Sequence, residues 1–243
     1  MRFKAFAAAL GCVLTLSSLS AFPVSAQGYG QGKQVNENNV PIGAVEFNNA
    51  YKELNALALS EDERYIILTF DQGYENGYTT KILDTLREKN VKAIFFLTGD
   101  YAKRERALVE RMVAEGHVLG NHGMTHAAMP TLSADELETE IVSLHDYVEA
   151  EYGYTMQYLR PPCGEFTDST LAAAQKLGYS TVFWSFAYVD WLTDSQPDEA
   201  QALSELTDSL HGGAIYLLHS VSATNAAVLG DFIDAARAKG YQL

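Results

Sequence analysis

Short apolar runs alternate with amphipathic segments from residue 65 onward, and this alternation constrains the fold of the chain more than any other feature. We interpret the apolar runs as strands, at residues 65–70, 92–97, 117–120, 158–160, 180–184 and 214–218. We interpret the segments between and after them as helices, at residues 79–89, 104–115, 133–151, 169–177, 198–210 and 225–239. Ser133, three residues before Glu136, fits a capping box at one helix start. Strands and helices in strict succession favour a parallel sheet.

Polar residues with possible chemistry follow five of these strands. They are Asp71, the pair His122 and His126, Arg160, Asp190 and His219. An open, doubly wound sheet brings together only the strands that flank its switch point. A barrel gathers the carboxyl ends of all its strands in one ring, where active sites form. The sequence therefore predicts an α/β fold, an irregular (β/α) barrel with fewer than the usual eight strands and its active site at the C-terminal strand ends.

The first 60 residues differ in composition from the rest of the chain. Residues 1–26 combine Arg2 and Lys4 with an apolar stretch and end in Val-Ser-Ala, which predicts a secretory signal peptide and export. An uncleaved N-terminal membrane anchor is the alternative. Residues 27–60 begin with Gln, Gly and Asn and are expected to form a linker and N-terminal extension with at most one helix, at 47–59. The folded domain is predicted over 61–243.

Charge and cysteine content exclude several classes of protein. The formal net charge is −14, and loss of the signal peptide would make it −16, so a general field that attracts nucleic acid or anionic membranes is excluded. Cys163 would be the single cysteine of the mature chain, so no internal disulfide is expected. The glycines form neither a P-loop nor a dinucleotide fingerprint, so no nucleotide cofactor is expected.

His122 and His126 stand four residues apart in a loop after the third strand. Two imidazoles at this spacing can hold one metal ion, although a pair of surface histidines shows the same pattern. A hydrolytic metal site usually has a third protein ligand, often a carboxylate. Asp71, which begins the polar part of TFDQG, can bind metal, serve as a base or form a turn.

Two further pairs are suggested by the strand ends. The guanidinium of Arg160, which precedes a loop made rigid by proline, can hold the carboxylate of Asp71 or form a purely structural ion pair. Asp190 can orient the imidazole of His219 and raise its basicity. Nearby aromatic residues can stack on sugar rings or simply pack in the core; they are Tyr74, Trp184, Tyr188 and Trp191.

Taken in order, TFDQG, HGMTH, RPPCG, DW and LLH resemble the five motifs of the polysaccharide deacetylases, the NodB-type domain of carbohydrate esterase family four. The resemblance extends from residue 65 to the C-terminus. The longer strings TFDQGYENGYT, YLRPPCGEF, VFWSFAYVDW and GAIYLLHSVS are most similar to the delta-lactam-biosynthetic peptidoglycan de-N-acetylases. The family fold is an irregular (β/α) barrel with about seven parallel strands, in agreement with the argument from strand ends.

The resemblance also implies roles for individual residues. Asp71 would be the general base, His219 the general acid, Asp190 its orienting partner, and Arg160 the residue that holds Asp71. His122 and His126 would bind a divalent metal, Zn²⁺, with Gln72 at the position of the third ligand. The residues expected to contact substrate are Tyr74, Pro162, Cys163, Gly164, Trp191 and Leu217.

Three positions depart from the family pattern. Gln72 stands where most members have an aspartate, and its neutral oxygen is a poorer ligand than a carboxylate. Gly123 replaces the usual serine or threonine, and Cys163 replaces a position that is often tyrosine or arginine. The family's last strand is expected to be short or missing near residues 241–243.

The predicted function is hydrolytic removal of acetyl groups from peptidoglycan, from N-acetylmuramic acid residues on the route to muramic δ-lactam in the spore cortex. The protein is expected to act as a monomer at the cell wall. The alternatives are deacetylation of chitooligosaccharides and a catalytically silent module that binds wall glycans.

Overall fold

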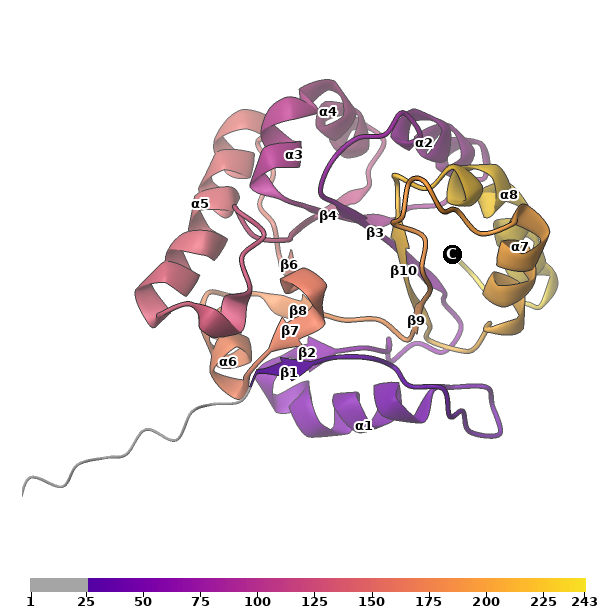
Figure 1. Ribbon diagram of the computed structural model, residues 1–243, viewed down its shortest axis with the longest axis horizontal. Coiled ribbons are helices and arrows are strands. Elements are labelled where there is room, and N and C mark those ends of the chain that lie inside the picture. The colour runs from indigo at the N-terminus through magenta and orange to yellow at the C-terminus, as the bar shows by residue number, and fades with distance from the viewer. Residues whose placement is uncertain (1–25) are drawn as a thin grey trace, which may run out of the picture.

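The computed structural model describes residues 26–243, so the predicted signal peptide and its alternative, an anchor, fall outside the described residues except for Ala26. Eight strands form one sheet in the order β2-β8-β6-β5-β4-β3-β10-β9, and all neighbours run parallel. Their bounds are Ala56–Leu57 (β2), Ile67–Gln72 (β3), Ile94–Leu97 (β4), Val118–Asn121 (β5), Tyr158–Leu159 (β6), Ser180–Val182 (β8), Phe186–Ala187 (β9) and Ile215–His219 (β10). The sheet curls into an incomplete ring, which confirms the predicted irregular barrel, although it has eight strands rather than the expected seven or so (Figure 1).

Helices surround the ring on its outer side (Figure 1). Their bounds are Ile42–Tyr51 (α1), Thr79–Glu88 (α2), Gly99–Arg104 (α3), Arg106–Ala114 (α4), Ala134–Tyr152 (α5), Asp168–Lys176 (α6), Glu199–Asp208 (α7) and Ala223–Ala238 (α8). Three short 3₁₀ helices add Lys52–Leu54 (η1), Met129–Thr131 (η2) and Pro162–Gly164 (η3). The predicted capping box of Ser133 and Glu136 is present at the start of α5. Within the described part of the chain, no helix is long and apolar enough to span a bilayer.

The helix expected at residues 104–115 is present as α4 (106–114), and a further short helix, α3 (99–104), which was not predicted, precedes it. Thr98 caps α3 early, because its side chain accepts a hydrogen bond from the Tyr101 amide. Glu105 then leaves the helical region, with φ −103° and ψ 42°, and α4 starts afresh at Arg106. The sequence pattern missed α3 because a helix of six residues is too short to show a clear amphipathic period.

The segment 27–60 is more structured than the predicted linker. Strand β1 (Gln27–Gly28) pairs antiparallel with β7 (Glu165–Phe166), and β2 joins the parallel sheet beside β8. The helix lies at 42–51 rather than 47–59. Aromatic rings explain why a polar segment packs so well: Tyr29 and Phe47 contact each other at 4.8 Å and both contact Phe183. Figure 1 shows this indigo segment across the open side of the ring.

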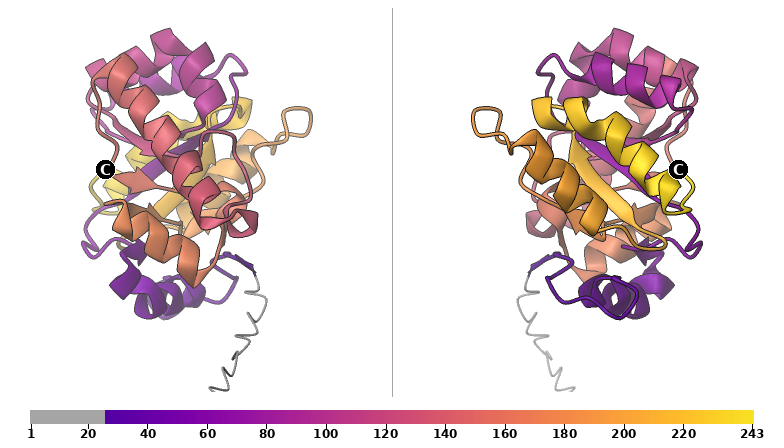
Figure 2. Two further views of the ribbon diagram at one scale, coloured as in Figure 1. Left: turned by 90° about the vertical axis from the view of Figure 1, so that its left-hand side faces the viewer. Right: turned by 90° about the vertical axis from the view of Figure 1, so that its right-hand side faces the viewer.

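The ring is tied at its ends by isolated bridges. Leu59 bridges Ala214 antiparallel, which links the chain after β2 to the start of β10. Near the C-terminus, Gln242 makes a parallel bridge to Tyr65, so the last strand expected from the family is reduced to this bridge. The side views in Figure 2 show the segment between β9 and α7 standing away from the body of the molecule.

Alternation along β3 separates the ring interior from the outer core. Leu68 and Phe70 pack in the layer that also holds Ile82 and Leu83 of α2. Residues of the other parity, Thr69 and Asp71, face the interior because successive side chains of a strand point to opposite faces. The interior below the site is closed by Phe96, Val182 and Ile215. The carboxyl ends of the strands therefore open above a filled ring.

Candidate active site

A cavity of about 820 Å³ opens at the carboxyl ends of the strands. Residues at or just after the ends of β3, β4, β5, β6, β8, β9 and β10 line it, together with the N-terminal segment. The residues that line it and were predicted to carry chemistry are Asp71, His122, His126 and His219. The cavity thus brings together groups that are separated by up to 148 positions in sequence, as the argument from strand ends required.

Asp71 and Arg160 form an ion pair beneath the cavity. Arg160 Nη1 donates to Asp71 Oδ1 at 2.8 Å and to Thr69 Oγ1 at 2.7 Å. The remaining donors of Arg160 bond the carbonyl oxygens of Val182 and Phe183, each at 2.9 Å, and the guanidinium is fully buried. Burial alone would raise the pKa of Asp71, but the charge and hydrogen bond of Arg160, together with His122 and His219, outweigh burial and hold the pKa below its usual value. Asp71 is therefore an anion near neutral pH.

His122 is held as a neutral imidazole with one nitrogen free. Its Nδ1 lies 2.8 Å from the carbonyl oxygen of Arg160, which can only accept, so Nδ1 carries the proton. The other nitrogen, Nε2, lies 3.6 Å from Asp71 Oδ2. Burial lowers the pKa of His122 to about 4, despite the nearby carboxylate. The ring of His126 lies 4.9 Å away from that of His122, centroid to centroid.

His219 and Asp190 form the second polar pair. His219 Nδ1 lies 2.7 Å from Asp190 Oδ1, and the His219 backbone amide donates to Oδ2 at 2.8 Å. Asp190 is fully buried and also accepts from Asn225 Nδ2 at 2.6 Å. Burial would lower the pKa of His219, but Asp190 and, to a smaller extent, Asp71 raise it above its ordinary value. In the β10–β3 register His219 is the direct partner of Asp71, so base and acid candidates are neighbours.

Gln72, the predicted third metal ligand, does not line the cavity. It has the parity of Leu68 and Phe70 on β3, and its side-chain amide donates to Ser220 Oγ. Its Oε1 atom is buried without a hydrogen-bond partner. Strand alternation turns Gln72 away from the side of Asp71, so this placement does not support its expected role as third metal ligand.

Most of the predicted substrate contacts line the cavity. These are Tyr74, Cys163, Gly164, Trp191 and Leu217. Pro162 is buried and does not line it, so its expected substrate contact is not supported. Trp184 lines the cavity from a mostly buried position, whereas Tyr188 is buried and donates its hydroxyl proton to Asn225. Trp191 also contacts His219, with ring centroids 5.7 Å apart.

Sequence reasoning missed the part of the wall that comes from the N-terminal segment. Tyr29, Gly30 and Gln31 line the cavity. Gln31 Oε1 accepts the indole proton of Trp184 at 3.0 Å, and the Tyr29 hydroxyl bonds the Trp184 carbonyl oxygen at 2.5 Å. The available signal was the presence of Tyr29 and Gln31 in a stretch that is otherwise rich in glycine. The polar composition of that stretch led us to interpret it as a linker.

The residues present fit a divalent ion with imidazole ligands. The backbone carbonyl oxygen of Arg160 accepts the proton on Nδ1 of His122. The lone pair of Nε2 is therefore free, as in histidines that bind metal. His126 supplies a second imidazole at the same wall. Within residues 26–243, no group of three or more His, Cys, Asp and Glu side chains is arranged to hold a metal ion. The site therefore offers two protein ligands of the type Zn²⁺ prefers rather than three.

The barrel, the strand-end cavity and its paired acid and imidazole groups define a hydrolase site on an α/β scaffold, and comparison identifies the class. Residues 58–182 match the family model described as polysaccharide deacetylase. The chain belongs to the polysaccharide deacetylase family and is an enzyme of that class.

Individual relatives agree with this assignment. The chain is 40% identical over 223 residues to a peptidoglycan-N-acetylmuramic acid deacetylase, PdaA, of Bacillus subtilis, covering 91% of this chain and 84% of that protein. The solved structure of Bacillus subtilis PdaA, a family 4 carbohydrate esterase, superimposes with a TM-score of 0.85 at 38% identity, over 91% of this chain and 95% of that one. A family 4 pseudoenzyme from Bacillus anthracis has a TM-score of 0.72 at 27% identity, over 77% and 66% of the two chains.

Proposed function

We propose that this protein removes the acetyl group from N-acetylmuramic acid residues of peptidoglycan by hydrolysis of the amide bond. The observation that carries the proposal is the pairing of Asp71 with His219 across β3 and β10 at one cavity, each with its own buried partner. The substrate class follows from the similarity to PdaA along nearly the whole chain. We further propose that the protein is exported to the cell wall and that its product serves formation of muramic δ-lactam in spores.

Asp71 acts as the general base. Its pKa is held low, so it is ionised at neutral pH and can accept a proton from a water molecule. That water attacks the carbonyl carbon of the acetyl group, and the pair of electrons of the carbonyl bond moves to oxygen. Arg160 keeps the carboxylate in place through its bond to Oδ1, which leaves Oδ2 toward His122 and the cavity.

His219 acts as the general acid. Its raised pKa keeps it protonated when Asp71 is ionised, so the two groups hold opposite protonation states at the same pH. Nδ1 is bonded to Asp190, which leaves Nε2 to donate a proton to the sugar nitrogen as the carbon–nitrogen bond breaks. The products are acetate and a free amine. A divalent cation held by His122 and His126 would supply Lewis acidity toward the acetyl carbonyl oxygen.

Release of acetate tests the proposal. Peptidoglycan from which stem peptides have been removed is incubated with the protein, with and without added Zn²⁺. Asp71→Asn and His219→Ala are each expected to lower kcat by roughly 10²–10⁴-fold, since each removes one proton transfer. A chelator is expected to lower activity and added Zn²⁺ to restore it, because two ligands hold an ion less firmly than three.

The same assay decides between the alternatives. Faster release from chitooligosaccharides than from peptidoglycan would replace the proposed substrate. Binding of peptidoglycan without release of acetate would indicate a silent module, as the loss of the family's carboxylate at Gln72 allows. Unchanged release by both variants would reject the assignment of base and acid.

A further inference from the structure

The loop that carries His122 and His126 has a conformation that needs support. Gly123 has φ +85° and His126 has φ +60°. The left-handed region is disfavoured for residues with a Cβ atom, so His126 is strained in the absence of compensating contacts. The loop also contains no helix or strand of its own between β5 and η2. What holds the two imidazoles on one wall must therefore come from a neighbouring element.

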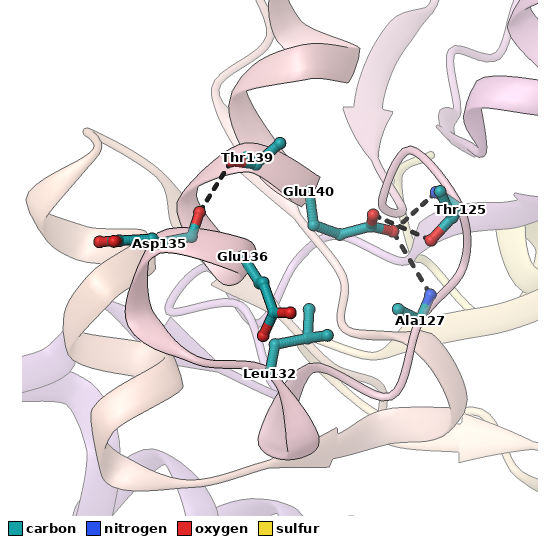
Figure 3. Close-up of a pocket in the computed structure, with 7 residues that line it drawn as sticks. All are labelled: Thr125, Ala127, Leu132, Asp135, Glu136, Thr139 and Glu140. Carbon is teal, nitrogen blue, oxygen red and sulfur yellow. Dashed lines mark hydrogen bonds between the residues drawn. The ribbon is translucent and has the colours of Figure 1, made fainter.

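Helix α5 supplies that support through Glu140, which points at the loop (Figure 3). Its Oε1 accepts from the backbone amide of Thr125 at 2.7 Å and from that of Ala127 at 3.3 Å. Its Oε2 accepts from the Thr125 hydroxyl at 2.9 Å. These contacts flank His126 on both sides, and the Glu140 carbonyl oxygen also accepts from the Met124 amide at 3.1 Å.

The environment of Glu140 indicates that this is its main role. The residue is only 7% exposed, and among residues 26–243 no salt bridge joins its carboxylate to a cation. A buried carboxylate is costly unless hydrogen bonds satisfy it, and the carboxylate of Glu140 accepts its hydrogen bonds from Thr125 and Ala127 of the loop. Loop and carboxylate therefore stabilise each other.

The departure at Gly123 fits the same picture. A Cβ atom built at Gly123 would lie 2.7 Å from Glu140 Oε1, closer than atoms normally approach. The carboxylate thus occupies the space that a serine or threonine side chain would begin to fill. The small residue Gly123 thus leaves room for the Glu140 carboxylate, which connects the histidine motif to a residue of α5 that lies 17 positions further along the chain.

We propose that Glu140 is a positioning residue, which holds residues 125–127 so that His122 and His126 face the same point of the cavity. The inference rests on the proposed function, because that function gives the two imidazoles a shared metal ion. The inference adds how the loop that carries them is held. Glu140 itself lies on the far side of the loop and does not line the cavity.

The test compares substitutions at Glu140 in purified, ion-free protein. Glu140→Leu keeps the volume and removes both acceptors, whereas Glu140→Gln keeps one oxygen for the two amides. Glu140→Asp keeps the charge but moves the carboxylate away from the loop. It provides the test of the positioning role if Glu140→Leu does not fold. The matched control is Glu138→Gln, an exposed acid on the same helix.

Two quantities are measured for each variant, the Kd for Zn²⁺ by competition with a chromophoric chelator, and amide hydrogen exchange at Thr125 and Ala127 without ion. We expect Glu140→Leu and Glu140→Asp to weaken Zn²⁺ binding about 10–100-fold and to speed exchange at both amides. Glu140→Gln should recover most of both properties, and Glu138→Gln should match the wild type.

The outcomes separate the two hypotheses. Wild-type exchange rates at Thr125 and Ala127 in folded Glu140→Leu or Glu140→Asp would overturn the positioning role. If His126→Ala leaves the Kd for Zn²⁺ unchanged, the ion site of the proposed function fails. Faster exchange in the Glu140 variants would then still establish that Glu140 holds the loop.

Discussion

Arg160 shows how much one residue contributes to this site. Its guanidinium is fully buried, stacks over the Phe96 ring at 4.2 Å, and donates to a carboxylate, a hydroxyl and two carbonyl oxygens. A buried ion pair adds little net stability when intact, but loss of one partner leaves a buried charge. Arg160 therefore links the stability of the ring interior to the ionisation of Asp71, the proposed base.

Arg160→Met is expected to reduce the free energy of unfolding by about 3–5 kcal/mol, because Asp71 and two carbonyl oxygens lose their partner. Chemical denaturation measures the change. Arg104→Met is the control, since Arg104 forms only an exposed ion pair with Asp100, and it should leave the denaturation midpoint unchanged. Equal midpoints for both variants would contradict the structural role of Arg160.

The pKa values of Asp71 and His219 predict the pH dependence of catalysis. Activity requires Asp71 ionised and His219 protonated, so kcat/KM should form a bell. Its acidic limb should lie below the usual value for an aspartate and its alkaline limb above that for a histidine. Asp190→Asn removes the charge that contributes most to the raised pKa of His219, while burial continues to lower that pKa. The alkaline limb should therefore move to lower pH.

The pH profile of kcat/KM checks this prediction, with Asp194→Asn as control, an exposed acid of the same loop. An alkaline limb that stays in place in Asp190→Asn would show that His219 is not the acid. A shift in both variants would point to the general charge of the loop instead.

At the scale of elements, the sequence predicted those strands that are continuous apolar runs and the polar residues that follow them. It missed β2, which lies in a segment assigned to a helix, and β9, which follows closely after the run assigned to the preceding strand; both strands have only two residues. It also missed Glu140, although a signal was present. The buried face of α5 is Leu137, Glu140, Ile141, Leu144 and Val148, so the glutamate lies on an apolar stripe where a solvent-facing acid would not.

The N-terminal segment is the element whose function is most easily tested. Gln31→Ala removes the acceptor of the Trp184 indole proton and part of the cavity wall. Because Gln31 touches neither proton-transfer residue, we expect KM to rise severalfold with kcat nearly unchanged. Steady-state kinetics measures both constants, and Gln34→Ala, an exposed neighbour, is the control. A loss confined to kcat would contradict a role in the wall.

At the scale of the whole molecule, charge affects how the substrate approaches. The chain has a formal charge of −14, and among the described residues that line the cavity none is a lysine or arginine. Muramic acid carries a carboxylate, so repulsion should raise its KM at low salt. Raising the ionic strength from about 0.01 M to about 0.15 M shortens the screening length from about 30 Å to about 8 Å and should lower KM.

A neutral N-acetylglucosamine oligomer is the control for this effect, because its KM should not respond to salt. Kinetics at several ionic strengths with both substrates gives the comparison. A KM for the muramic acid substrate that rises with salt would mean that attraction, not repulsion, governs its binding.

The convergence of the site was predictable from sequence because a parallel ring places all carboxyl strand ends together. The direction of each side chain was less predictable. Asp71 and Gln72 are adjacent in sequence, yet one lines the cavity and the other bonds Ser220 outside it. Such a difference depends on strand parity and local register, which a motif match does not contain.

The packed interior of the ring also affects the route by which water enters the site and acetate leaves it. Arg160 and Phe96 stack on each other and are both fully buried, so side chains fill the described interior of the ring beneath the cavity. We expect water and acetate to pass through the mouth of the cavity at the carboxyl strand ends, which also receives the glycan. The small product can therefore be trapped beneath the large one, and departure of the sugar strand would then set the pace of each turnover.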